Sequence, residues 1–185
     1  MTTQIKGNDT STFGGAITAN NVGAGNVLQV VSTNKTDTFT SAAASTWTDI
    51  TGMSVSITPK STSSKIMIII SMFGVFWQAG FNGCIVSLVR NSTFIGGGDA
   101  SESRSSVIGT QGMTNQSSGG RIDSGVQYHV TYIDSPSTTS SVTYKLQFWQ
   151  DTAGNPIYVN RTNSDGNGTA WPRTSSSIIA VEVAG

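Results

Sequence analysis

The sequence is poor in the residues that most often carry enzyme and metal chemistry. Its 185 residues include a single cysteine, Cys84, and a single histidine, His129. A disulfide within the chain is therefore excluded, and neither a His/Cys metal cluster nor a Cys-His nucleophile pair has the material it needs. Cys84 begins the apolar alternation Cys84, Val86, Leu88, which predicts a buried thiol. We expect no enzyme activity, no catalytic or metal site and no cofactor.

Charge is scarce as well. Ten basic and ten acidic residues cancel, and charged residues make up 11% of the chain, against about 25% in an average soluble protein. A chain without a basic excess has no electrostatic attraction for nucleic acid or anionic lipid, so we expect neither as a partner. The polar surface must consist mainly of hydroxyl and amide groups.

Long apolar runs are also few. The most apolar stretch, KIMIIISMFGVFW at 65–77, is interrupted by Ser71 and Gly74. Its apolar part is about 12 residues long, whereas a membrane-spanning helix needs about 20. Its content of Ile, Val and Phe favours a strand. The N-terminal residues show no basic stretch followed by an apolar one, so we expect no signal peptide, no membrane segment and synthesis in a cytoplasm.

Short apolar runs that alternate with turn-forming stretches begin at Val27 and continue to the C-terminus. This pattern is typical of an all-β, antiparallel β-sandwich. Residues 1–26 contain few large apolar side chains, so we expect a short extended N-terminal attachment arm at 1–26 and a β-sandwich knob at 27–185. The expected strands lie near 27–32, 36–40, 46–51, 53–58, 65–77, 84–90, 93–96, 126–133, 141–150, 156–160 and 177–183.

A period of two assigns the faces of several strands. Around 142–148 the apolar side chains are Val142, Tyr144, Leu146 and Phe148, and polar residues alternate with them. The segment 65–77 differs, because Ile66, Ile68, Ile70 and Met72 occupy one face while Met67, Ile69 and Phe73 occupy the other. One face packs on the opposite sheet. Met67, Ile69 and Phe73 are therefore predicted to contact a second subunit, or else the N-terminal arm.

Two long loops and their aromatic residues form a second candidate site. The intervals 97–125 and 160–176 lack strand signals, and long loops in compact domains are often functional. Tyr158 and Trp171 lie in or beside the second loop. Their rings could stack on a sugar, or they could fill the end of the sandwich or a subunit contact.

Several strings of the sequence resemble a recurrent domain of tailed-bacteriophage virion proteins, frequent in phages of cyanobacteria and other aquatic bacteria. The resemblance covers nearly everything after residue 26 and implies a jelly-roll β-sandwich that works as a trimer, without catalytic residues. It rests on VLQVVSTNKTDTF (27–39), WTDITGMSVSITPKSTSSKIMIII (47–70), VSLVRNSTFIGGGD (86–99), YIDSPSTTSSVTYKLQFW (132–149), YVNRT (158–162) and SSSIIAVEVAG (175–185).

The resemblance implies a structural protein on the virion surface, made in the host bacterial cytoplasm. We expect a homotrimeric decoration or cement protein on the outside of the head. Its arm would bind the major capsid protein through Ile5, Phe13, Ile17 and Val22. The alternative is a short tail fibre or receptor-binding tip, attached to tail or baseplate proteins, that recognises host polysaccharide through the two loops.

Overall fold

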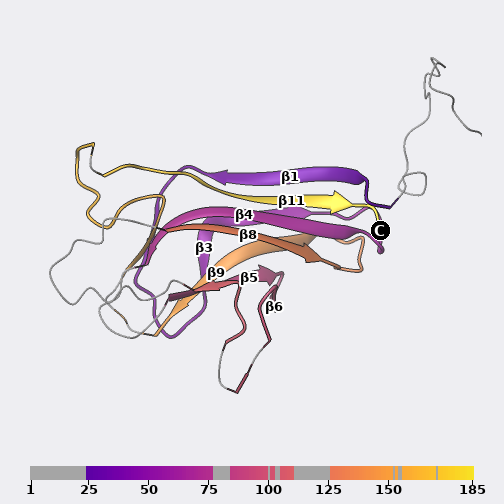
Figure 1. Cartoon of the computed structure of the whole chain (residues 1–185), viewed down its shortest axis with the longest axis horizontal. Coiled ribbons are helices and arrows are strands. Elements are labelled where there is room, and N and C mark those ends of the chain that lie inside the picture. Colours follow the sequence, from indigo (N-terminus) through magenta and orange to yellow (C-terminus); the bar gives the residue numbers. More distant parts are fainter. Residues whose placement is uncertain are drawn as a thin grey trace, which may run out of the picture.

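Two antiparallel sheets make up the folded part of the chain. The computed structural model describes residues 24–76, 84–99, 101–102, 105–110, 126–151, 153, 156–169 and 171–185. It confirms the expected all-β sandwich, whose sheets curl over one another (Figure 1). The strands are β1 (Val27–Lys35), β2 (Phe39–Ser41), β3 (Thr48–Ile57), β4 (Lys65–Phe76), β5 (Cys84–Arg90), β6 (Thr93–Ile95), β7 (Gly109–Thr110), β8 (Val126–Asp134), β9 (Val142–Gln150), β10 (Ile157–Val159) and β11 (Ser176–Val183).

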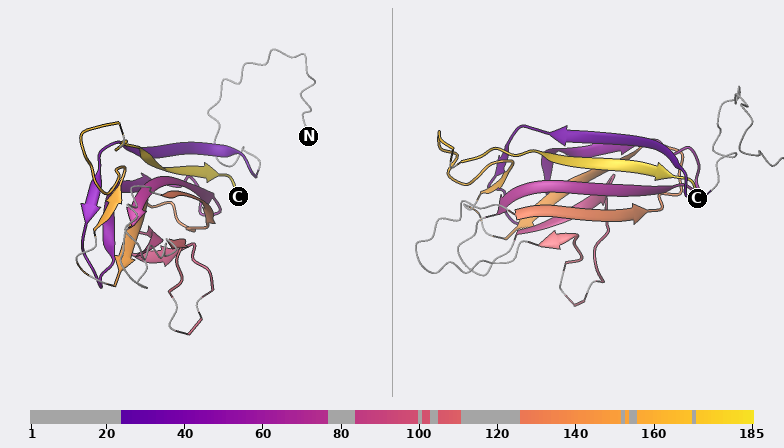
Figure 2. Two further views of the ribbon diagram at one scale, coloured as in Figure 1. Left: turned by 60° about the vertical axis from the view of Figure 1, so that its left-hand side comes forward. Right: turned by 45° about the horizontal axis from the view of Figure 1, so that its top comes forward.

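The order of the strands is that of a jelly roll. Sheet A has the order β1-β11-β4-β10-β2, with β8 on the other edge of β4, and sheet B has the order β3-β9-β5-β6, with β7 also paired to β5. The longer strands thus form the sets β1-β11-β4-β8 and β3-β9-β5-β6, which is the jelly-roll arrangement. Figure 2 shows β1, β11, β4 and β8 side by side in one layer.

Strand β4 lies at the centre of sheet A. One of its edges pairs first with β11 and then with β10, and its other edge pairs with β8. Its inward face packs in the core between the two sheets, and in β9 of sheet B alternate side chains are buried there as the period of two predicts. The largest fully buried side chains of β4 and β9 are Ile66, Ile68, Ile70, Met72, Tyr144, Leu146 and Phe148.

Cys84 lies in the core, as the apolar alternation around it predicts. Burial raises the pKa of its thiol to about 12. The neutral thiol is therefore the form present at physiological pH, and the residue serves as a small apolar side chain.

The structure differs from the sequence-based expectation in two strands. The segments 46–51 and 53–58 form one strand, β3, whose register against β9 shifts between Asp49 and Ser54. Gly52 lies inside this bulge with a φ of +83°, a conformation that L-residues with a side chain rarely adopt. The short strand β7 lies within the expected 97–125 loop and pairs with β5.

A buried polar cluster joins the two sheets near one end of the sandwich. Asp134 of β8 is only 5% exposed. Its carboxylate accepts hydrogen bonds from Arg90 Nη1 at 2.9 and 3.0 Å and from the Tyr144 hydroxyl at 2.7 Å. Burial, together with the hydrogen bond to Asp134, raises the pKa of Tyr144, which keeps its proton. Because Arg90 and Tyr144 belong to sheet B, the cluster fixes the position of β8 over that sheet.

The variant Tyr144→Phe tests this cluster. It removes one hydrogen bond to a buried carboxylate, so we expect the free energy of unfolding to fall by about 1.5–3 kcal/mol. Urea unfolding followed by circular dichroism measures the change. The matched control is Tyr132→Phe, which removes a hydroxyl from the same face of β8 as Asp134. We expect it to change the free energy of unfolding by less than about 0.5 kcal/mol. Equal losses in both variants would contradict a special role for the Asp134 bond.

Candidate assembly face and loop site

An apolar row crosses the outer face of sheet A. The register places Val30 of β1 opposite Val181 of β11, Val181 opposite Met67 of β4, and Met67 opposite Ile133 of β8. The two ends of the row are the most exposed, since Val30 is 58% and Ile133 is 61% exposed. Side chains directly opposite one another on one face of a sheet are in contact distance, so the four form a continuous stripe.

Two further rows lie beside the first. Ile179 and Ile69 face one another across the β11–β4 pair, and Ser32 and Thr131 continue that row on the outer strands. The following row is polar and includes Ser71. The apolar surface therefore has a defined limit. We call this apolar surface the assembly face. Its residues are Val30, Val181, Met67, Ile133, Ile69 and Ile179.

The structure brings together two of the three predicted subunit contacts. Met67 and Ile69 lie on the assembly face, and both are only partly buried. Phe73 lies on the same side of β4 but beyond the polar row that contains Ser71, where it pairs with Gln127. The prediction that β4 has a second apolar face therefore agrees with the structure, and Phe73 belongs to a separate part of that face.

The four residues predicted to anchor the arm, Ile5, Phe13, Ile17 and Val22, lie outside the described residues. The first hydrogen bonds of the sandwich are formed just before β1. Gly25 donates to the carbonyl of Ala184, and Ala184 donates to the carbonyl of Asn26, both at 2.8 Å. The ladder between β1 and β11 thus extends into the end of the segment 1–26.

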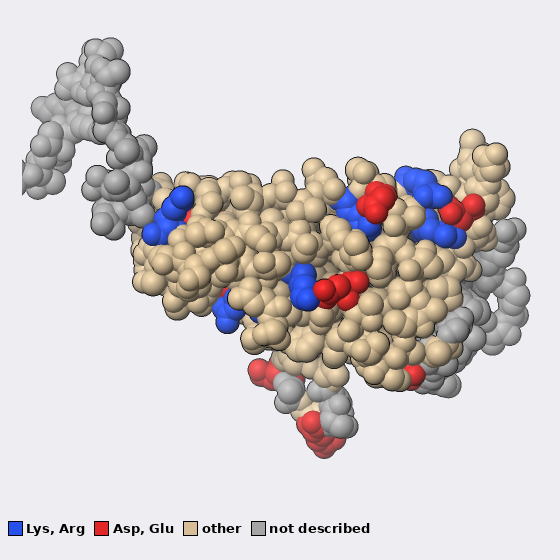
Figure 3. Space-filling model, turned by 180° about the vertical axis from the view of Figure 1, so that it is seen from behind, with Lys and Arg blue, Asp and Glu red and all other residues tan. Residues whose placement is uncertain are grey.

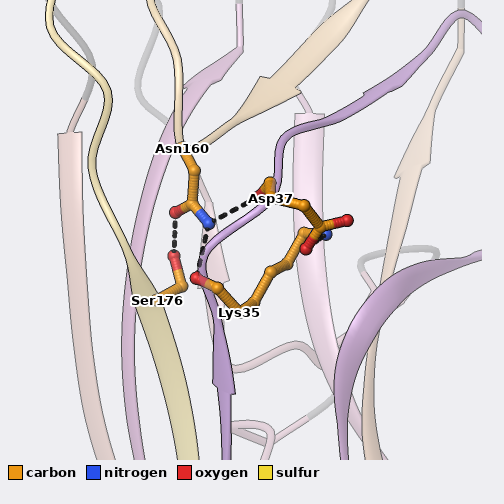
Figure 4. A network of polar contacts seen from close by, with 4 residues as sticks. All are labelled: Lys35, Asp37, Asn160 and Ser176. Atoms are coloured by element: carbon orange, nitrogen blue, oxygen red, sulfur yellow. Dashed lines mark hydrogen bonds and ion pairs between the residues drawn. The ribbon is translucent and has the colours of Figure 1, made fainter.

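The loop 160–176 is tied to the sandwich by Asn160 (Figure 4). Its side-chain amide donates to the carbonyls of Lys35 and Asp37 at 2.8 and 3.0 Å, and its side-chain oxygen accepts from the Ser176 hydroxyl at 2.6 Å. Asn160 is buried and has a φ of +61°, which Asn tolerates better than most residues. One side chain therefore joins the ends of β1, β10 and β11.

Tyr158 and Trp171, the predicted glycan contacts, each pack against this loop. The guanidinium carbon of Arg161 lies 4.6 Å from the centre of the Tyr158 ring, a cation–π contact. The Trp171 ring packs on Gly166 and Gly168, and a Cβ at Gly166 would come within 3.0 Å of it. Each ring therefore packs against residues of the loop. These contacts favour the alternative in which the two rings fill the end of the sandwich.

Metal-ligand clusters and membrane-spanning helices are two other kinds of site that the described part of the chain could contain. There, no group of three or more His, Cys, Asp or Glu residues could hold a metal ion. The described residues likewise contain no helix of sufficient length and hydropathy to cross a membrane. No family model matches the sequence, and no curated protein matches it either.

The variant Asn160→Ala tests how the loop is held. It removes the three hydrogen bonds of a buried side chain. It also leaves alanine, which tolerates a positive φ less well than asparagine, at this position, so we expect a loss of about 3 kcal/mol in the free energy of unfolding. Thermal and urea unfolding measure the loss. Asn34→Ala, at an exposed position of β1, is the control. Equal stability of the two variants would show that the Asn160 bonds contribute nothing.

Proposed function

We propose that this chain is a structural protein of a bacteriophage virion, assembling as a homotrimer that decorates the outer surface of the head. The observation that carries the proposal is the assembly face. Val30 and Ile133 are each more than half exposed, and covering the exposed part of each would contribute about 1 kcal/mol. A second copy of the same chain supplies such a cover at every site of a repeating particle.

The surface composition supports a role in a permanent assembly. On the face drawn in Figure 3 charged side chains are sparse, and several Lys or Arg side chains lie beside an Asp or Glu, while acidic side chains at the lower edge lie apart from them. Ion pairs among the described residues include Lys145 with Asp49, and Arg161 and Arg173 with Asp165. Such a surface has little long-range field, so association depends on shape and apolar contact.

The resemblance of the sequence to phage virion domains supports a place on the virion surface. In this proposal the arm at 1–26 binds the major capsid protein, and the sandwich projects outward. A short tail fibre with the same knob is the competing assignment. Locating the chain in a density map of the intact virion decides between them: density on the head supports decoration, and density at the tail tip overturns it.

The assembly face makes a prediction about oligomeric state. The wild-type protein is expected to be a trimer at micromolar concentration, and the double variant Val30→Lys, Ile133→Lys to be a monomer, because two charges would have to be buried without partners. Light scattering coupled to size-exclusion chromatography measures the mass. The variant should keep its β-rich circular dichroism spectrum, since both positions are exposed in the single chain.

The matched control adds the same charge elsewhere. Ser54→Lys, Ser141→Lys changes two exposed positions in and beside sheet B and should leave the trimer intact. A monomeric wild-type protein, or loss of the trimer in both double variants, would contradict assembly through this face.

A further inference from the structure

The outer face of sheet B carries a pair of aromatic rings that neither the fold nor the assembly face requires. Trp47 immediately precedes β3, and Phe94 lies in β6, the strand at the opposite edge of the sheet. Their ring centroids are 4.7 Å apart, with an angle of 50° between the planes. Because β9 and β5 lie between β3 and β6, the two rings must extend toward each other over the middle of the sheet.

Two outward-facing residues of β5, in the same sheet, are almost completely covered. Val86 and Leu88 of β5 point into the core, so Ser87 and Val89 point outward. Ser87 and Val89 are nevertheless only 0% and 2% exposed. Among the described residues the Ser87 hydroxyl has no hydrogen-bond partner. The outer face of β5 is therefore covered by neighbouring side chains and contains one buried polar group without a partner among the described residues.

A row of polar side chains lies next to the rings. Gln147 Nε2 donates to Asp49 Oδ1 at 2.6 Å, and Lys145 Nζ lies 2.8 Å from the same carboxylate. Desolvation acts to raise the pKa of Asp49, but the hydrogen bonds from Lys145 and Gln147 and the charge of Lys145 outweigh it and lower the pKa. Asp49 is therefore an ionised acceptor whose charge is balanced by its neighbour.

These features fit one class of ligand. A neutral sugar has apolar C–H faces that stack on aromatic rings and hydroxyl groups that exchange hydrogen bonds with carboxylates and amides. The cancelling charges of Asp49 and Lys145 favour a neutral ligand over an anion or a cation. Phe94 is 45% exposed, so one ring of the pair is open to solvent.

We propose that the outer face of sheet B binds a neutral saccharide. A pyranose ring stacks on Phe94 and Trp47, and its hydroxyl groups bind Asp49 and Gln147. A protein partner is less well matched, since the aromatic pair is small and is bordered by the exposed polar residues of β3.

The test is to titrate the protein with cellohexaose, maltohexaose, mannohexaose and chitohexaose. Isothermal titration calorimetry and tryptophan fluorescence measure the binding. At least one of these sugars is expected to bind with a dissociation constant in the millimolar range or tighter. Phe94→Ala and Gln147→Ala should each weaken that binding about tenfold. Gln147→Ala leaves both rings in place, so it tests the site even if the aromatic variant unfolds.

Tyr158→Ala is the matched control, because it removes an aromatic ring from the loop site and leaves sheet B unchanged. Its affinity for the sugar should equal that of the wild type. The proposal is overturned if none of the four sugars binds, or if binding is lost in Tyr158→Ala and kept in Phe94→Ala and Gln147→Ala. Binding of a capsid or tail protein through Phe94 without any sugar binding would show a protein contact in its place.

Discussion

The constraint on which the rest of this structure depends is the pairing of β4 on both of its edges. This strand of twelve residues forms ladders with β11, β10 and β8, and β1 and β2 are added to sheet A through β11 and β10. Its inward side chains belong to the core that it shares with the inward side chains of sheet B. In the set β1-β11-β4-β8 the two outer strands are β1 and β8. The connections carry the chain back and forth between the two sheets, as in a jelly roll.

The two outer faces of the sandwich have different chemistry. On sheet A, apolar side chains from four strands fall into one row because their registers coincide at Val181 and Met67. On sheet B polar and apolar side chains share the outer face, and the rings of Trp47 and Phe94 are in contact there. Assembly through sheet A would leave the face of sheet B open. Under the two proposals the subunit contact and the saccharide site would therefore lie on opposite faces of the sandwich.

Much of the fold could be predicted from the sequence, because the period of two in β9 and β8 and the apolar content of β4 are local signals. The bulge at Gly52 and the short strand β7 could not, since both are decided by pairing with distant strands. The aromatic pair of the proposed saccharide site could not be predicted for the same reason: Trp47 and Phe94 lie far apart in the chain, and only the strand order brings their rings together. Tyr158 and Trp171 were conspicuous in the sequence because they lie in or beside a loop.

The buried polar residues give this fold its register. Glu182 is fully buried and accepts hydrogen bonds of 2.6 Å from the Gln29 side chain and from the backbone nitrogen of Lys60. A slip of β11 by one residue would turn Glu182 outward and Val181 inward. The buried bonds would then be lost, and a carboxylate would enter the apolar row beside Met67. The contacts that specify the register inside the sandwich therefore also determine which side chains appear on the assembly face.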